Sequence, residues 1–356
     1  MKTRVLVVED SLTARKRMCE VLNADPEIEI VGEAGDGRLA IEMCRETRPD
    51  VITMDMILPV MSGVAATEYI MAYFPTPILV VSSSFNRGEV FKTYEALAAG
   101  AVDVLEKPRG DEPDGVWERK FIASVKLVSR IRVITHPRAR LRISRSPQPP
   151  ARFAPGHQTS AKRRYHVIAV GASTGGPGAL VEVLRAVPSD FPIPVVIVLH
   201  INEPFGAAFA EWLSLQTSCR VAYAEDGQPV AAAAGQVVMA PPDRHLVVRE
   251  GRLRLTLDAE RHSCRPSVDA LFESVAREYG RAGAACLLTG MGRNGAAGLL
   301  EVRKAGGLTI AQDEATCVVY GMPREAVLLG AAERVLPLDE IGPVLGSLVP
   351  EDKEKP

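Results

Sequence analysis

The chain has 356 residues, of which 47% are hydrophobic and 24% are charged, and its formal net charge is −2. The length favours two domains of ordinary size, and the composition is typical of a globular protein in water. No run approaches the ~20 apolar residues that span a membrane, and the first residues do not read as a signal peptide. We therefore expect a cytoplasmic protein without membrane insertion.

Short apolar runs alternate with helical patterns in the first third of the chain. Four of these runs predict strands buried on both faces, and a weaker fifth run covers 29–34; the four are 4–8, 50–54, 77–82 and 102–107. Strands that alternate with helices indicate a parallel sheet with helices on both faces. The first domain is therefore predicted as a doubly wound, flavodoxin-like α/β unit over 1–120.

The next segment, 121–164, is basic and rich in Pro and Ser. No Asp or Glu occurs from Arg119 to Tyr165. The positive charge is compatible with binding nucleic acid or acidic lipid, but aromatic residues for stacking are absent from the Pro- and Ser-rich stretch 145–164 apart from Phe153. We favour a flexible linker that starts within or after a basic amphipathic helix at 117–134, and we expect no nucleic-acid partner.

The α/β pattern resumes over 165–348. Strand-like runs end in loop residues at five places, and an alternating segment with a central Glu-Gly, 245–257, predicts a β-hairpin; the five runs are 165–173, 194–200, 237–242, 284–290 and 308–313. The second domain is therefore predicted as a Rossmann-like, doubly wound parallel sheet with a hairpin.

Five polar residues stand at the carboxyl ends of predicted strands in the first domain. Glu9 and Asp10 follow the first strand, Asp55 follows the third, and Ser82 and Lys107 end the next two. Carboxyl ends of parallel strands meet at one edge, so these side chains should share a crevice. Three close carboxylates repel one another unless a hard cation joins them, and Mg²⁺ is the predicted cation. Asp55 would then be a nucleophile toward a phosphoryl group.

The segments "VVEDS", "MDMILPVMSG", "VVSSS" and "VLEKP" resemble those of a response-regulator receiver domain. The resemblance covers 3–108 and implies that Asp55 accepts phosphate from a histidine kinase. It also implies that Ser82 and Lys107 contact the phosphoryl oxygens. Val104 stands where receivers often carry an aromatic residue, so an aromatic switch is not expected.

The segment "VIAVGASTGGPGAL", 167–180, places Ser173 in a glycine-rich turn between a strand and a helix. Free N–H groups at such a turn stabilise negative charge. Two interpretations fit: the loop cradles a phosphate, or Ser173 is a nucleophile beside an oxyanion hole. The loop matches neither the dinucleotide nor the P-loop pattern.

A serine nucleophile needs a base, and His200 ends the next strand at the same edge of the sheet. A third group should orient the imidazole. The glycine loop after the strand at 284–290 offers Asn294, and Asp313 and Glu314 are the nearest other acids at a strand end.

These segments resemble the CheB family of chemotaxis protein-glutamate methylesterases. The matching pieces include "GASTGGP", "APPDRHL", "RPSVDALFESVA", "LTGMGRNGAAGL" and "AQDEATCVVYGMPREA". The resemblance implies that Ser173 attacks a methyl ester of a chemoreceptor glutamate, with His200 as base and Met291, Gly175 and Gly176 near the oxyanion. It also implies glutamine deamidation, methyl-accepting chemotaxis receptors as partners, and no cofactor for the esterase.

The chain departs from that family at Asn294, where an aspartate is usual. Three explanations are open: Asn294 presents its carbonyl oxygen to the ring, Asp313 or another acid substitutes, or the domain is a weak esterase that acts as a phosphorylation-controlled adaptor. Asn202 and Glu203 add polarity after the histidine, and Cys317 is expected to be buried and inert. The order of domains implies that phosphorylation of Asp55 uncovers the Ser173 loop.

Overall fold

The computed structural model describes residues 2–84, 86–108, 113, 115–131, 133, 164–201 and 204–349. The chain divides into two compact units, one built around residues 2–133 and the other around residues 164–349. Most of the predicted linker, 134–163, lies outside the described residues. No helix in the described ranges combines the length and the apolarity that crossing a bilayer requires.

The first unit is a five-stranded parallel sheet in the order β2-β1-β3-β4-β5. Its strands are β1 (Thr3–Val8), β2 (Ile28–Ala34), β3 (Val51–Met54), β4 (Ile78–Ser82) and β5 (Asp103–Glu106). The predicted doubly wound fold is confirmed, including the weak second strand. The order reverses beside β1, so the carboxyl ends of β1 and β3 form the crevice where ligands bind in such sheets.

Helices α1 to α4 of this unit begin at polar capping side chains. The caps Ser11, Asp36, Ser62 and Asn86 each accept a backbone N–H of the first turn, which satisfies a donor that the helix leaves free. The helices are α1 (Leu12–Asn23), α2 (Gly37–Thr47), α3 (Gly63–Tyr73) and α4 (Arg87–Ala98). Local sequence therefore fixes where each helix starts after its strand.

Helix α5 (Val116–Ser129) belongs to the first unit and crosses the predicted domain boundary at residue 120. Its side chains Trp117, Phe121, Val125 and Val128 are buried in one core with residues of β1, β3 and β4. Their spacing places them on one face of the helix. The helix predicted at 117–134 is therefore present as α5, and it belongs to the core of the first unit although the predicted linker includes its residues beyond 120.

The second unit is a seven-stranded parallel sheet in the order β14-β13-β12-β6-β7-β9-β8. Its strands are β6 (Val167–Ala172), β7 (Val195–Leu199), β8 (Arg220–Tyr223), β9 (Gln236–Met239), β12 (Gly283–Leu287), β13 (Leu308–Gln312) and β14 (Arg334–Leu336). The predicted parallel sheet is confirmed. The short edge strands β8 and β14 were not predicted.

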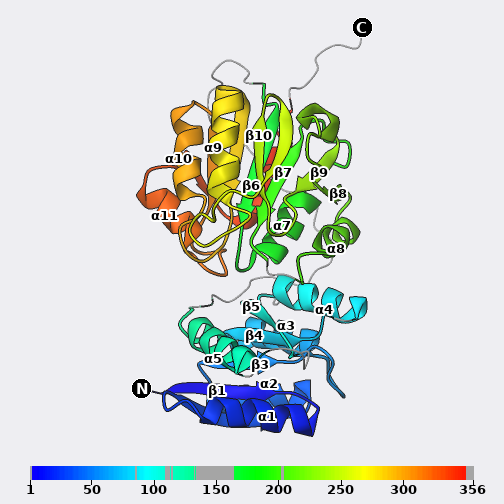
Figure 1. Cartoon of the computed structure of the whole chain (residues 1–356), viewed down its shortest axis with the longest axis vertical. Helices are drawn as coiled ribbons and strands as arrows, with labels where there is room; N and C mark the ends of the chain where they lie inside the picture. The colour runs from blue at the N-terminus through cyan, green and yellow to red at the C-terminus, as the bar shows by residue number, and fades with distance from the viewer. Residues whose placement is uncertain are drawn as a thin grey trace. The chain divides into compact units, whose positions relative to one another are not determined.

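The strand order reverses at β6, which pairs with β7 on one side and β12 on the other. Loops at the carboxyl ends of these three strands therefore surround the switch point of the sheet. The helices of this unit are α7 (Gly176–Arg185), α8 (Phe209–Gln216), α9 (Val268–Tyr279), α10 (Ala296–Lys304), α11 (Met322–Leu328) and α12 (Leu338–Gly346). In Figure 1, α9 and α10 lie side by side against one face of the sheet.

The predicted hairpin forms from β10 (His245–Arg249) and β11 (Arg252–Thr256), which are antiparallel. Its turn residues Glu250 and Gly251 both have positive φ, 53° and 66°, as a two-residue hairpin turn requires. Leu246, Val248 and Leu253 are buried with residues of α9 and the sheet. The chain that leaves β11 then runs to α9, and this segment contributes to the site described next.

Candidate functional site

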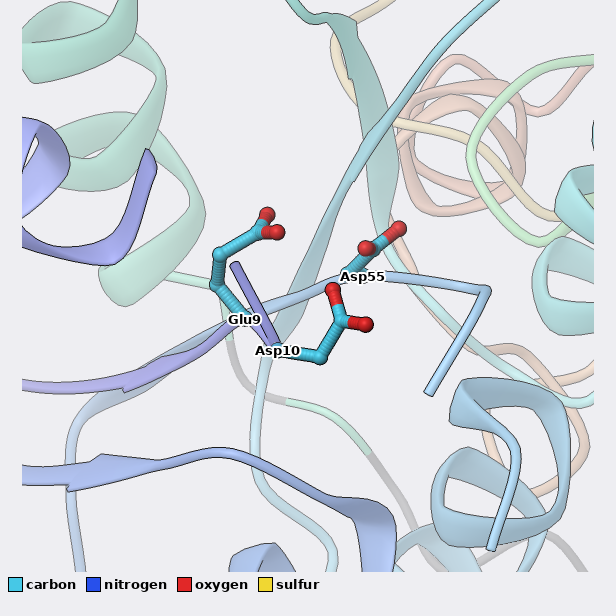
Figure 2. Close-up of side chains that lie close together, drawn as sticks. All are labelled: Glu9, Asp10 and Asp55. Carbon is cyan, nitrogen blue, oxygen red and sulfur yellow. The ribbon is translucent and has the colours of Figure 1, made fainter. Parts of the chain in front are cut away.

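Glu9, Asp10 and Asp55 lie together at the carboxyl ends of β1 and β3, as predicted. One carboxylate oxygen from each lies within 4.8 Å of the others, and Figure 2 shows the three side chains at this edge. Glu9 and Asp55 are buried, with 1% and 5% of their surface exposed. Carboxylate oxygens at this spacing are the donor set that a hard divalent cation prefers.

Lys107 lies beside two of these acids. Its Nζ atom is 2.8 Å from Glu9 Oε2 and 2.9 Å from Asp55 Oδ2. Burial alone would lower the pKa of Lys107, but the carboxylates of Asp55 and Glu9 raise it above its ordinary value. Burial raises the pKa of Glu9. The lysine is therefore charged at neutral pH and already faces Asp55.

Ser82 is the fifth predicted member of this cluster. Its side chain is fully buried at the end of β4, and its Oγ atom has no hydrogen-bond partner within the described ranges. An unpaired buried hydroxyl costs free energy unless a ligand completes it. Ser82 is thus suited to hydrogen-bond an incoming oxyanion near Asp55.

Ser173 and His200 stand at the ends of two paired strands in the second unit. Ala172 pairs with Leu199 in the β6–β7 register, and the His200 N–H donates to the Ala172 carbonyl at 3.0 Å. The two residues that follow these strands are therefore neighbours at one edge of the sheet. Both side chains are partly exposed, so a substrate can reach them.

The loop after β12 packs directly against Ser173. The Ser173 N–H donates to the Thr289 carbonyl at 3.0 Å, and the Gly290 N–H donates to the Val319 carbonyl at 3.1 Å. A Cβ atom on Gly290 would lie 2.7 Å from Ser173 Cβ and 2.5 Å from Met322 Sδ. Only glycine allows this close approach, so the position of the serine depends on it.

The predicted oxyanion residues lie in the loops beside Ser173. Gly175 has φ of 77° and Gly176 starts α7, while Met291 follows Gly290 and is 41% exposed. These positions agree with a site at the end of β6 and β12. Their role as donors to an oxyanion stays a prediction.

The imidazole of His200 is held in a weakly polar environment. Burial lowers the pKa of His200 from 6.5 to about 4, and the Asn294 side chain opposes part of this shift. The Nε2 atom is buried and has no hydrogen-bond partner in the described part of the chain. The ring is neutral at pH 7, the form that a general base requires.

Asn294 is buried, with 2% exposed, and its side chain interacts with His200 and with groups at the start of α9. Its Oδ1 atom accepts the Val268 N–H at 2.6 Å, which identifies the oxygen end of the amide. Its Nδ2 atom donates to the Arg261 carbonyl at 3.1 Å and to Ser267 Oγ at 2.9 Å. The Oδ1 atom therefore serves the first turn of α9, and its presentation to the His200 ring stays a prediction.

Asp313, the other predicted candidate, is engaged within its own loop. Its Oδ1 atom accepts from the N–H and the hydroxyl of Thr316, at 3.0 and 2.5 Å. The fully buried Asp269 was missed at the sequence level; its carboxylate accepts the Gly298 N–H at 2.7 Å and lies 3.5 Å from His262 Nε2. Neither acid makes a described contact with His200.

Cys264 is a neighbour of His200 that the sequence did not indicate. The Sγ atom of Cys264 lies 3.8 Å from His200 Nδ1. The loop between β11 and α9 brings this thiol to the ring, and no motif marks it. Cys317 is buried and burial raises the pKa of its thiol, whereas Asn202 and Glu203 lie outside the described residues.

The two units define a class of protein: a receiver-like domain with an acidic cluster and a lysine at its switch point, joined to a parallel-sheet domain with a serine and a histidine at its own. Comparison with known families agrees. The model of the family "CheB methylesterase" matches residues 168–345, and the model "Response regulator receiver domain" matches residues 5–113.

Two proteins similar over nearly their whole length carry the name protein-glutamate methylesterase/protein-glutamine glutaminase. The second such protein of Anaeromyxobacter dehalogenans is 44% identical over 97% of this chain and 96% of its own length. The second of Pseudomonas aeruginosa is also 44% identical, with the same shares covered. The catalytic domain of Thermotoga maritima CheB methylesterase is 36% identical over 52% of this chain and 99% of its own, with a TM-score of 0.49.

The chain therefore belongs to the CheB methylesterase family. It is a carboxylic ester hydrolase with an amino-terminal receiver domain, as the resemblance implied. The alternative interpretation, an adaptor with a weak esterase domain, finds no support in these comparisons.

Proposed function

We propose that this chain removes methyl groups from glutamate side chains of methyl-accepting chemotaxis receptors, and that phosphorylation of Asp55 controls the reaction. The observation that carries the proposal is the placement of Ser173 beside His200 at the ends of two paired strands, with a buried Nε2 atom that has no hydrogen-bond partner among the described residues. Relatives named for both methylesterase and glutaminase activities extend the proposal to glutamine deamidation.

In the proposed reaction, Ser173 Oγ attacks the ester carbonyl carbon while His200 Nε2 takes the hydroxyl proton. The backbone N–H groups near Gly175, Gly176 and Met291 stabilise the negative oxygen of the tetrahedral intermediate. His200 then gives its proton to the departing methoxide, and methanol leaves an acyl-serine. Water, deprotonated by His200, hydrolyses the acyl-serine to a glutamate carboxylate and restores Ser173. With a glutamine substrate, ammonia leaves in place of methanol.

The receiver domain supports the regulatory part of the proposal. Asp55 would accept a phosphoryl group from a histidine kinase, while Lys107 and Ser82 contact the phosphoryl oxygens. Glu9, Asp10 and Asp55 would hold Mg²⁺, which neutralises charge on the transferring group when bound. The close carboxylate oxygens and the unpartnered Ser82 hydroxyl are the structural features that fit this role.

The proposal is tested by measuring methanol release from membranes that contain methylated receptors. We expect the wild-type chain to release methanol, and Ser173→Ala and His200→Gln each to lose at least about 10³-fold in rate. Exposed Ser189 in the loop before β7 offers a matched control, because Ser189→Ala should retain the wild-type rate. Equal release by wild type and Ser173→Ala would exclude Ser173 as the nucleophile.

A further inference from the structure

The side of His200 that faces away from its unpartnered Nε2 atom carries a thiol. Cys264 Sγ lies 3.8 Å from His200 Nδ1, within hydrogen-bond reach for sulfur. In a serine hydrolase the group at this nitrogen selects the tautomer of the base. The residue at this position therefore matters for whether Nε2 is free to accept a proton.

The hydrogen bonds of Cys264 determine the direction of this contact. The sulfur lies 3.3 Å from the His262 carbonyl oxygen, which can only accept, so the S–H donates there. The sulfur lone pairs then face His200, and Nδ1 must carry the proton. Burial raises the pKa of the Cys264 thiol, so the group stays neutral and protonated at pH 7. The resulting tautomer leaves Nε2 as an acceptor.

A tight turn fixes the thiol in this place. Arg261 and Cys264 exchange backbone hydrogen bonds of 3.2 and 3.0 Å, and the two residues between them have positive φ, 54° at His262 and 57° at Ser263. Positive φ in residues other than glycine persists only where the surroundings hold it. Here the Arg261 guanidinium binds both oxygens of Glu273, at 2.7 and 2.6 Å.

Asn294 supports the same turn from the other side. Its Nδ2 atom donates to the Arg261 carbonyl, the same oxygen that accepts the Cys264 N–H. The residue that replaces the usual acid of the family thus acts on His200 through its own side chain and also supports the turn that carries the thiol. An aspartate at position 294 has no donor for this carbonyl.

We propose that Cys264 is a positioning residue for the base His200, and that Asn294 and the Arg261–Cys264 turn hold its thiol against Nδ1. The catalytic role of Cys264 rests on the proposed function, whereas its contact with His200 does not. It assigns to a neutral thiol the task of tautomer selection that a carboxylate performs in an acid-containing triad. Such a site lowers the charge near the imidazole and keeps the base neutral over a wide range of pH.

Kinetics of cysteine variants test the role in catalysis. Cys264→Ala should lower kcat for methanol release about tenfold with KM unchanged, because one weak hydrogen bond to the base is lost. Cys264→Ser keeps a group that both donates and accepts, and should stay within about threefold of wild type. Cys219→Ser is the matched control, since Cys219 is buried and bonds the Leu184 carbonyl far along the chain from the site. Unchanged kcat in Cys264→Ala would overturn the proposal.

Titration of His200 by NMR in the full-length chain tests the geometry without any substrate. The signal is identified by its loss in His200→Gln. Cys264→Asp should raise the pKa of His200 by at least about one unit, because a carboxylate within ~4–6 Å favours the imidazolium. Ser263→Asp adds the same charge in the same turn, but on an exposed side chain. It should raise the pKa of His200 by less than half as much.

In the described structure the Cys264 thiol and the Asn294 amide lie against the ring, and neither is charged at neutral pH. An equal shift in Cys264→Asp and Ser263→Asp would overturn the assignment of Cys264 to Nδ1. Absence of methanol release from every variant, together with the expected titration shift, would reject the proposed function and leave the contact intact.

Discussion

The receiver crevice and the esterase site lie at equivalent places in two parallel sheets, but they use charge in opposite ways. The first gathers three carboxylates and a lysine within a few ångströms, with ion pairs of 2.8 and 2.9 Å. The second surrounds a histidine with an amide and a thiol, and burial lowers the pKa of the imidazole to about 4. Charge suits a site that binds a cation and a phosphoryl group, whereas a neutral environment keeps a base unprotonated.

The largest expected effect concerns the charged site. Asp55→Asn should abolish formation of acid-labile phosphate on the chain when a small phosphodonor and Mg²⁺ are supplied, because the nucleophilic oxygen is lost. Asp50→Asn is the matched control, since Asp50 stands before β3 at the opposite edge of the sheet and bonds the Arg4 N–H. Phosphate on the Asp55→Asn chain would place the modification elsewhere.

A second prediction concerns the loop that supports Ser173, the proposed nucleophile. Gly290→Ala should lower kcat for methanol release at least about tenfold, because the added methyl would displace Ser173 and a misplaced nucleophile is costly. Gly330→Ala controls for strain: φ is 66° and no atom lies within 4 Å of the added Cβ. This control should lose about 1 kcal/mol of stability with its kinetics unchanged. Normal kcat in Gly290→Ala would show that the serine tolerates the crowding.

The neutrality of the second site predicts its pH dependence. The base acts in its unprotonated form, so kcat/KM should stay level from pH 8 to about pH 5 and fall by half near pH 4. The folded pKa lies below the unfolded value, so the neutral form contributes stability that is complete above about pH 6.5 and is lost as the pH falls toward 4. Unfolding should be followed over the same range, to separate loss of fold from loss of rate. A fall in kcat/KM centred near pH 6.5 would contradict a buried and uncharged environment for His200.

A smaller effect, on stability, is expected at Asn294. Asn294→Asp would introduce a carboxylate into the uncharged site and so make it resemble the receiver crevice. Asn294→Asp should destabilise the chain by about 1–3 kcal/mol in urea unfolding, because two buried hydrogen bonds lose their donor. The matched variant Asn86→Asp should be neutral, since Asn86 accepts the Gly88 N–H as the cap of α4 and an aspartate oxygen can do the same. We also expect no rise in kcat, because the turn that carries Cys264 loses its support. A faster and equally stable Asn294→Asp chain would show that the site accepts an acid directly.

Residues that directly follow strands were predictable in both domains. Asp55, Lys107, Ser173 and His200 each end or follow a buried apolar run, and parallel pairing brings such positions together whatever the loops do. Cys264 lies in a connection between a hairpin and α9, whose path depends on tertiary hydrogen bonds such as that from Asn294. Strand order contains no information about that path, so the sequence did not indicate the thiol beside the base.

Helix α5 shows the same limit at the level of the fold. Its four buried apolar residues have helical spacing, but basic residues surround them, and composition alone suggested a linker. Packing against β1, β3 and β4 decides that the segment belongs to the first unit. Local pattern predicted a helix, and only tertiary contacts assign it to a domain.

The most direct test of the whole account is methanol release from methylated receptor membranes, measured for wild type and Asp55→Asn with and without a phosphodonor. We expect the phosphodonor to raise the wild-type rate, the Asp55→Asn chain to show only the unstimulated rate, and Ser173→Ala to release nothing under either condition. Stimulation that survives in Asp55→Asn, or release that survives in Ser173→Ala, would contradict control of a serine esterase by the charged site.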